Sequence, residues 1–139
     1  MNPKKMIGWK AILILTVLTM FSVITATAYA KTSTSTLEYK GTKATAKLET
    51  DFGWKIFGTK DKATATTSFT MSNNGYRVAV RLERWSDKNT MADFKYNKDS
   101  QIAQCNYTWT DVYAYMSRHS IDNSTNTVEY AVDSFNHKE

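Results

Sequence analysis

The chain has 139 residues, 18 Lys and Arg against 13 Asp and Glu, and one cysteine, which fits a single domain and excludes an intramolecular disulfide. The formal net charge of +5 does not indicate a nucleic-acid-binding protein, because three lysines fall within the first ten residues and the other basic residues are scattered. With His137 near the end of the chain set aside, one cysteine and one histidine are too few for a zinc site.

Residues 1–30 have the three parts of a cleavable secretory signal peptide. They begin with a positively charged segment, continue with an apolar run over 11–21, and end in the small-x-small triplet Ala28-Tyr29-Ala30. We therefore expect a signal helix that is removed after Ala30, leaving 109 residues with 15 basic and 13 acidic side chains. The alternative is a retained membrane anchor, since 11–28 approaches the length of a spanning helix, but its threonines and serine argue against one. The expected mature protein is secreted and has no membrane segment.

The stretch that follows the expected cleavage site is polar and of low complexity. Residues 31–36 read Lys-Thr-Ser-Thr-Ser-Thr, and we expect them to form a flexible spacer before a domain over 37–139. From Leu37 onward, a period-two alternation of apolar and polar residues dominates, which is typical of strands. Gly41 interrupts the first alternation and shifts its phase, which predicts a turn or bulge there.

The clearest local pattern predicts a β-hairpin over residues 63–83. Apolar and small side chains alternate with hydroxyl side chains from Ala63 to Met71, and a second clean alternation runs from Tyr76 to Glu83. Between them, Ser72-Asn73-Asn74-Gly75 provides residues that tolerate the positive φ of tight hairpin turns. One face of each strand is expected to enter a core and the other to meet water.

The remaining elements complete an all-β prediction. Residues 91–96 read as a strand or a short helical turn, 101–109 and 111–121 as two strands or one bent strand, and 128–132 as the last strand. Close-spaced strands without crossover helices predict a single small antiparallel β-sandwich or barrel, preceded by the N-terminal signal helix. Cys105 has the phase of a small buried core residue, the alternatives being an intermolecular disulfide or a reactive thiol.

Few side chains of the expected domain could support catalysis or bind a metal. His119 shares a strand face with Ser117, and Asp111 and Asp122 are near in sequence, but the arrangement is too loosely specified to make a triad. No spacing selects two carboxylates for glycoside hydrolysis. Residues 122–133 have oxygen-bearing side chains at some EF-hand positions but lack the turn glycine, so they read as an Asx-rich hairpin loop. We expect no catalytic residue, no metal and no cofactor, with a small secreted hydrolase as the least favoured alternative.

Aromatic side chains are the one compositional excess, at 13% of the chain. Trp85 is out of phase with the apolar face of its strand, and Tyr113 and Tyr115 lie opposite the apolar face of theirs. With Trp54, these residues form a candidate aromatic face that could bind a sugar ring or a protein partner. The alternative is that the rings fill the core of a disulfide-free sandwich.

The expected function is therefore that of a secreted, non-catalytic binding or interaction module. It would act at the cell surface or on an extracellular glycan or protein, and not on nucleic acid or a membrane. The alternative is a secreted bacteriocin-like toxin or host-directed effector, although no cationic amphipathic helix supports it.

Overall fold

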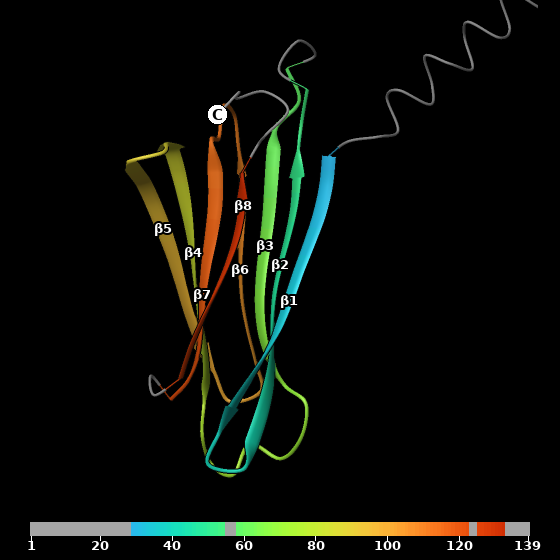
Figure 1. Ribbon diagram of the computed structural model, residues 1–139, viewed down its shortest axis with the longest axis vertical. Coiled ribbons are helices and arrows are strands. Elements are labelled where there is room, and N and C mark those ends of the chain that lie inside the picture. Colours follow the sequence, from blue (N-terminus) through green and yellow to red (C-terminus); the bar gives the residue numbers. More distant parts are fainter. Residues whose placement is uncertain (1–28, 55–57, 123–124, 133–139) are drawn as a thin grey trace, which may run out of the picture.

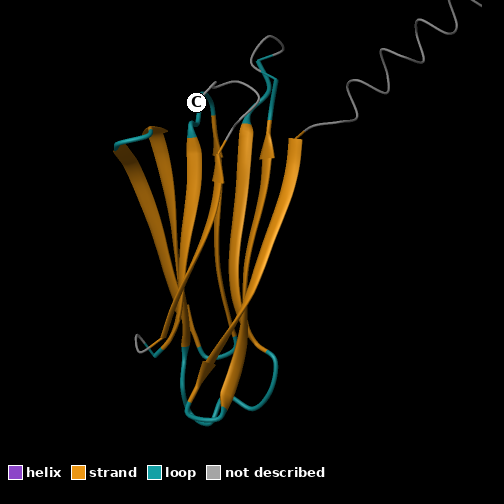
Figure 2. Cartoon of the chain, in the orientation of Figure 1, coloured by secondary structure: helices purple, strands orange, loops and turns teal. Residues whose placement is uncertain are grey.

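The computed structural model describes residues 29–54, 58–122 and 125–132, and within these ranges it contains eight strands and no helix (Figures 1 and 2). The strands are β1 (Tyr29–Tyr39), β2 (Thr42–Phe52), β3 (Asp61–Phe69), β4 (Val78–Asp87), β5 (Thr90–Asp99), β6 (Ile102–Trp109), β7 (Ala114–Ile121) and β8 (Thr125–Val132). The predicted signal peptide lies outside the described residues, apart from its last two positions.

The strands form two four-stranded sheets. Sheet A has the order β1-β2-β3-β6, and sheet B has the order β5-β4-β7-β8. All neighbouring strands are antiparallel, and Figure 1 shows the two sheets packed face to face. The predicted all-β antiparallel sandwich is thus confirmed. The ambiguous segment 91–96 belongs to strand β5, and 101–121 forms two strands, one in each sheet.

The predicted hairpin over 63–83 is wrong, although both of its strands exist. β3 pairs with β2 and β6 in sheet A, whereas β4 pairs with β5 and β7 in sheet B. The Asn-Gly segment has the expected positive φ, 48° at Asn74 and 81° at Gly75, but it belongs to a connection that crosses between the sheets. Alternation of apolar and polar residues shows only that a strand has one buried face. Two strands on opposite sides of a core therefore show the same alternation as two strands paired in a hairpin.

The expected spacer over 31–36 is part of β1 instead. This segment pairs residue for residue with β2, from Lys31 opposite Thr50 to Thr36 opposite Thr45. Threonine is a good strand former, and the backbone ladder with β2 orders a segment that has few apolar side chains. The tight turn that joins β1 to β2 falls at Lys40 and Gly41, where φ is 45° and 76°, as the phase shift at Gly41 predicts.

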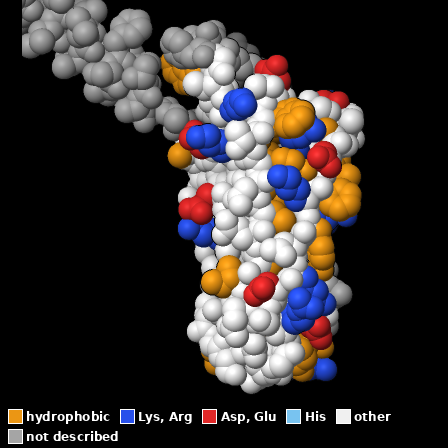
Figure 3. All heavy atoms as spheres, turned by 180° about the vertical axis from the view of Figure 1, so that it is seen from behind, with side chains coloured by type: hydrophobic (Ala, Val, Ile, Leu, Met, Phe, Trp, Pro, Cys, Tyr) orange, Lys and Arg blue, Asp and Glu red, His pale blue; other side chains and the backbone are white. Residues whose placement is uncertain are grey.

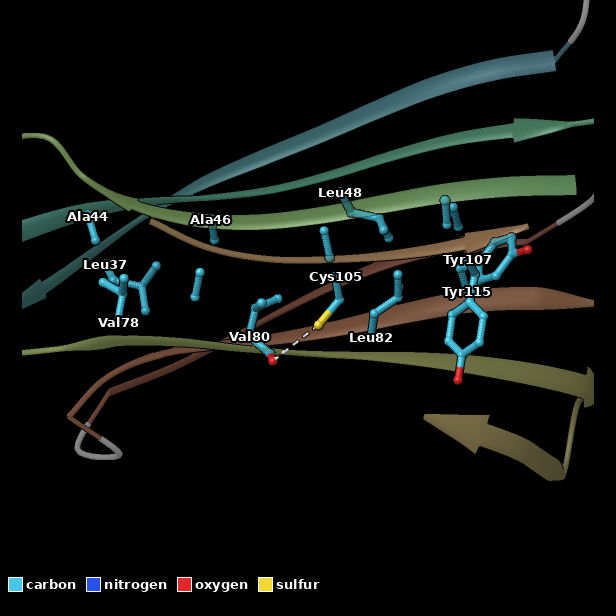
Figure 4. Close-up of a cluster of buried hydrophobic side chains, with 14 of the residues drawn as sticks. Leu37, Ala44, Ala46, Leu48, Val78, Val80, Leu82, Cys105, Tyr107 and Tyr115 are labelled. Atoms are coloured by element: carbon cyan, nitrogen blue, oxygen red, sulfur yellow. Dashed lines mark hydrogen bonds between the residues drawn. The ribbon is translucent and has the colours of Figure 1, made fainter. Parts of the chain in front are cut away.

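The core fills the space between the inner faces of the two sheets (Figure 4). Both sheets contribute large side chains, and sheet A also contributes a group of alanines that leaves room for them. The alanines are Ala44, Ala46, Ala63, Ala65 and Ala103; the larger side chains are Leu37, Leu48, Phe52 and Tyr107 from sheet A and Val78, Val80, Leu82, Tyr115 and Ile121 from sheet B. Cys105 is buried and unpaired, with its Sγ 3.9 Å from the Val80 carbonyl oxygen. Its predicted core position is confirmed, and burial raises the pKa of its thiol.

Candidate binding face

The two outward faces of the sandwich differ in chemistry. The outward face of sheet A carries mainly hydroxyl, amide and charged side chains, and its one large exposed apolar residue is Ile102. The outward face of sheet B gathers aromatic, thioether and guanidinium groups, which we call the aromatic–arginine face. It consists of Arg81, Glu83, Trp85, Met91, Phe94, Tyr96, Met116 and Arg118. Figure 3 shows hydrophobic and basic side chains gathered along one side of the molecule, beside a largely uncoloured surface.

Strand register explains why these side chains share a face. On β5, Phe94 is opposite Glu83 and Tyr96 is opposite Arg81; on β7, Arg118 is opposite Arg81. Residues directly opposite in an antiparallel pair lie on the same face, and so do residues two apart on one strand. The register between β4 and β5 shifts on either side of Trp85. The register with β7 is regular, so Trp85 lies two residues along the same face from Glu83, at the end of the face.

Glu83 is the electrostatic centre of the aromatic–arginine face. Its side chain is only 3% exposed, and three donors surround its carboxylate. Arg118 Nε donates to Oε1 at 3.1 Å, and Trp85 Nε1 donates to Oε2 at 3.2 Å. Arg81 Nε lies 2.9 Å from Oε1 but is not aligned for a hydrogen bond. A carboxylate so deeply buried is stable only with such partners, so Glu83 holds both arginines in place.

The outer parts of the two guanidinium groups have weak partners. Arg81 Nη2 donates to the Met91 sulfur at 3.4 Å, and Arg118 Nη2 to the Met116 sulfur at 3.6 Å. The Arg81 guanidinium also lies 4.0 Å from the centre of the Phe94 ring. Thioether sulfur is a weak acceptor, so among the described residues these donors lack a strong one.

A groove of about 250 Å³ runs beside the two arginines. Ala79 and Ser120 are opposite each other on β4 and β7 and form its floor, because both side chains are short. Its walls are Phe94 and Tyr96 from β5, with Arg81 and Arg118 from the central strands. Phe94 is 47% exposed and Tyr96 55% exposed, so aromatic surface and guanidinium donors border the same hollow.

The four predicted aromatic residues do not lie together. Trp85 belongs to the aromatic–arginine face and is half-buried. Tyr115 is fully buried in the core, where it stacks on Phe52 at 5.7 Å and its hydroxyl donates to the Asp61 carbonyl oxygen at 3.3 Å. Burial raises the pKa of its hydroxyl. Its ring therefore has no exposed surface for a ligand.

The other two predicted rings are partly exposed but lie outside the strands of sheet B. Tyr113 precedes β7, and its backbone N–H donates to the Trp85 carbonyl oxygen at 3.0 Å. Trp54 follows β2 of sheet A, and its carbonyl oxygen accepts a hydrogen bond from Thr59 Oγ1 at 2.9 Å. Phe94 and Tyr96 were missed as site residues. The sequence signal for Phe94 and Tyr96 was their alternation with the charged residues Asp93 and Lys95, which predicts that the two rings share one face of a strand.

His119 joins a chain of buried hydrogen bonds in the core. Its Nε2 lies 2.7 Å from Ser117 Oγ, and its Nδ1 lies 2.8 Å from Thr67 Oγ1. Thr67 uses its only hydrogen to donate to the Ala79 carbonyl oxygen at 2.9 Å, so His119 Nδ1 must donate to Thr67. The neutral ring then accepts from Ser117 at Nε2.

This Ser–His pair has the spacing of a nucleophile and its base, but both residues are fully buried. Burial lowers the pKa of His119 to about 4, although Glu129 opposes the shift. No atom of the pair meets solvent where a substrate could react, and we assign it to the core. Within the part of the chain that the structure describes, no group of acidic, His or Cys side chains could hold a metal ion. Nor does a helix there have the length and apolar character to cross a membrane.

Comparisons with known proteins give no relative from which a function could be transferred. No protein-family model matches the chain, and neither a curated protein nor a solved structure matches it.

Proposed function

We propose that this protein is a secreted, non-catalytic binding module that holds an extracellular glycan or protein on its aromatic–arginine face. The signal-like residues 1–30 support export. The observation on which the proposal rests is the groove bordered by Phe94, Tyr96, Arg81 and Arg118. These residues lie on the side of sheet B that faces away from the core, so packing of the sandwich does not require rings there.

The chemistry of the face supports binding rather than reaction. Exposed aromatic surface beside guanidinium groups is typical of recognition sites, where rings give contact area and arginine gives directed hydrogen bonds. Large apolar side chains clustered on an exposed surface also favour an interaction site over chance exposure. Glu83 already accepts from Arg118 and Trp85 and faces Arg81, so it is poorly placed to act as a general base.

A matched pair of variants tests which face binds. Tyr96 lies in the aromatic–arginine face and Ile102 on the outward face of sheet A, and they are 55% and 56% exposed. The mature protein would be passed over an array of extracellular glycans and matrix proteins, and dissociation constants measured for its ligands. We expect Tyr96→Ala to weaken binding about tenfold or more, as loss of an aromatic anchor does, and Ile102→Ala to leave binding unchanged.

Urea unfolding would first show that both variants are as stable as the wild type. Binding that survives Tyr96→Ala, or that Ile102→Ala weakens equally, would refute the assignment of the ligand face. Growth inhibition of neighbouring bacteria that persists in Tyr96→Ala would instead favour the secreted toxin.

A further inference from the structure

We propose that the groove binds a carboxylate-bearing sugar residue of an acidic extracellular polysaccharide. This inference rests on the proposed function and specifies its ligand. It follows from three features of the groove: its charged hydrogen-bond donors, the burial of the Glu83 carboxylate beside them, and the aromatic ring that borders it.

The charged hydrogen-bonding groups that face the groove are donors. Arg81 and Arg118 bring guanidinium donors to its walls, and their Nη2 atoms rest on thioether sulfurs. Among the described residues, the carboxylate between them is that of Glu83, which is 3% exposed and surrounded by three donors. The other polar side chains of the groove, Tyr96 and Ser120, have hydroxyls that both donate and accept, so its charged groups are donors only. A carboxylate, which only accepts, matches two guanidinium groups better than a neutral hydroxyl does, and the groove therefore favours an anionic group.

Charge complementarity agrees with this preference. Two guanidinium groups face one carboxylate, which leaves the centre of the aromatic–arginine face with one excess positive charge. Glu83 accepts a hydrogen bond from Arg118 Nε and forms an ion pair with Arg81 Nε at 2.9 Å, so both guanidinium groups are held beside the groove before a ligand arrives. Pre-ordered donors bind an anion with a smaller loss of conformational entropy.

The aromatic wall favours a sugar ring. Tyr96 is 55% exposed, and a pyranose can stack its C–H face on such a ring. The Phe94 ring already has the Arg81 guanidinium over it, 4.0 Å from its centre, so Tyr96 offers the more open surface. The groove volume of about 250 Å³ fits one sugar residue better than a folded partner.

An acidic peptide is the main competitor, and β5 is a poor edge for one. A peptide that extends a sheet needs free backbone groups on the edge strand. The backbone N–H of Phe94 donates to Asp93 Oδ1 at 2.7 Å, and Lys95 reaches across to the Asn106 carbonyl oxygen at 2.7 Å. Such side-chain caps and inward-turned charges are typical of edges protected against strand addition.

The test distinguishes recognition of the ligand's carboxylate from stacking on its sugar ring, and it identifies the face of the protein that binds. The mature protein would be titrated at constant ionic strength with three uronate polymers (polygalacturonate, alginate and hyaluronan). Fully methyl-esterified polygalacturonate keeps the ring but lacks the charge, and poly-L-glutamate keeps the charge but lacks the ring. Binding to at least one uronate polymer, about tenfold or more tighter than to both controls, is the expected result.

Two charge variants locate the site. Arg118→Gln removes a cation that is paired with Glu83, and Lys47→Gln removes one that is paired with Glu49 at 2.7 Å on sheet A. We expect the first to weaken uronate binding about tenfold or more and the second by less than about twofold, since a surface charge far from the site acts only through screened electrostatics. Equal losses would show nonspecific attraction and overturn the site.

The other outcomes distinguish this inference from the proposed function. Equal binding of the esterified polymer, still lost in Tyr96→Ala, would overturn recognition of the carboxylate but leave a glycan-binding face. Equal or tighter binding of poly-L-glutamate would overturn the sugar in favour of an acidic polypeptide. Failure to bind any uronate polymer, with other ligands lost in Tyr96→Ala, would overturn the inference alone.

Discussion

Acidification should destabilise this protein through one residue, His119. Its neutral ring accepts from Ser117 and donates to Thr67 inside the core. A protonated ring would have two donors, so the Ser117 hydroxyl would have to turn and accept instead of donate, and the charge would be buried with no carboxylate of the described residues at hydrogen-bond distance. Burial accordingly lowers the pKa of His119 from 6.5 to about 4.

The sign and size of the effect follow from linkage. Because the pKa is lower in the folded state, the unfolded chain binds the proton first, so stability is full above pH 6.5 and falls as the pH drops toward 4. With these two pKa values, the free energy of unfolding should fall by about 2 kcal/mol between pH 7 and pH 5. That is a large share of the total stability of a small domain.

The assay is urea unfolding of the protein at pH 7 and pH 5, where most carboxylates remain ionised in both folded and unfolded chains. His119→Gln keeps a donor and an acceptor but cannot take up the proton, and should lose most of the pH dependence. His137→Gln removes the only other histidine and should retain it. An NMR titration of His119 in the wild-type protein measures its folded-state pKa directly and does not depend on whether the His119→Gln variant folds. A folded-state pKa above 6, or an undiminished pH dependence in His119→Gln, would refute the reasoning.

Two further predictions concern the core. Asp61 is buried and accepts the backbone N–H groups of Gly53 and Val112, each at 2.9 Å, so Asp61→Ala should lower the free energy of unfolding by about 3 kcal/mol or more by leaving buried donors without an acceptor. Urea unfolding measures this, and a loss below about 1 kcal/mol would contradict it. Cys105 is buried with its thiol pKa raised, so a thiol reagent should label it only at the rate of unfolding. Rapid labelling of the folded protein, or a disulfide-linked dimer after purification, would show that it is accessible.

The fold was predictable where side-chain alternation decides it. β3 and β4 appear in the sequence because each has one buried face, but their separation into different sheets depends on which strands complete each ladder. The position of β1 was harder to predict, because its inward-facing side chains Ser33 and Ser35 are polar and are not typical of a core. They face the sandwich because both donate to the Glu129 carboxylate of β8, a partner more than ninety residues away that no local pattern reveals.

The aromatic–arginine face was only partly predictable for the same reason. The broken phase of Trp85 could be recognised from its own strand, and the structure places it on the outward side of sheet B. Tyr115 looked similar, but its ring is in the core and its hydroxyl bonds to the Asp61 carbonyl oxygen on sheet A. Phe94 and Tyr96 gain significance only through their register with Glu83 and Arg81 on the neighbouring strand.

Besides the groove itself, Glu83 is a second reason to propose the aromatic–arginine face as a binding surface. A carboxylate on the outward side of a sheet could remain in water at little cost, whereas this one is 3% exposed beneath two arginines and a tryptophan. Burying it adds little or nothing to stability compared with an apolar residue. What the arrangement does provide is two guanidinium groups at fixed positions beside a groove, with their outer donors on thioether sulfurs. Fixed, weakly satisfied donors beside an exposed ring are of little use to the core, but they are what recognition of an anionic ring requires.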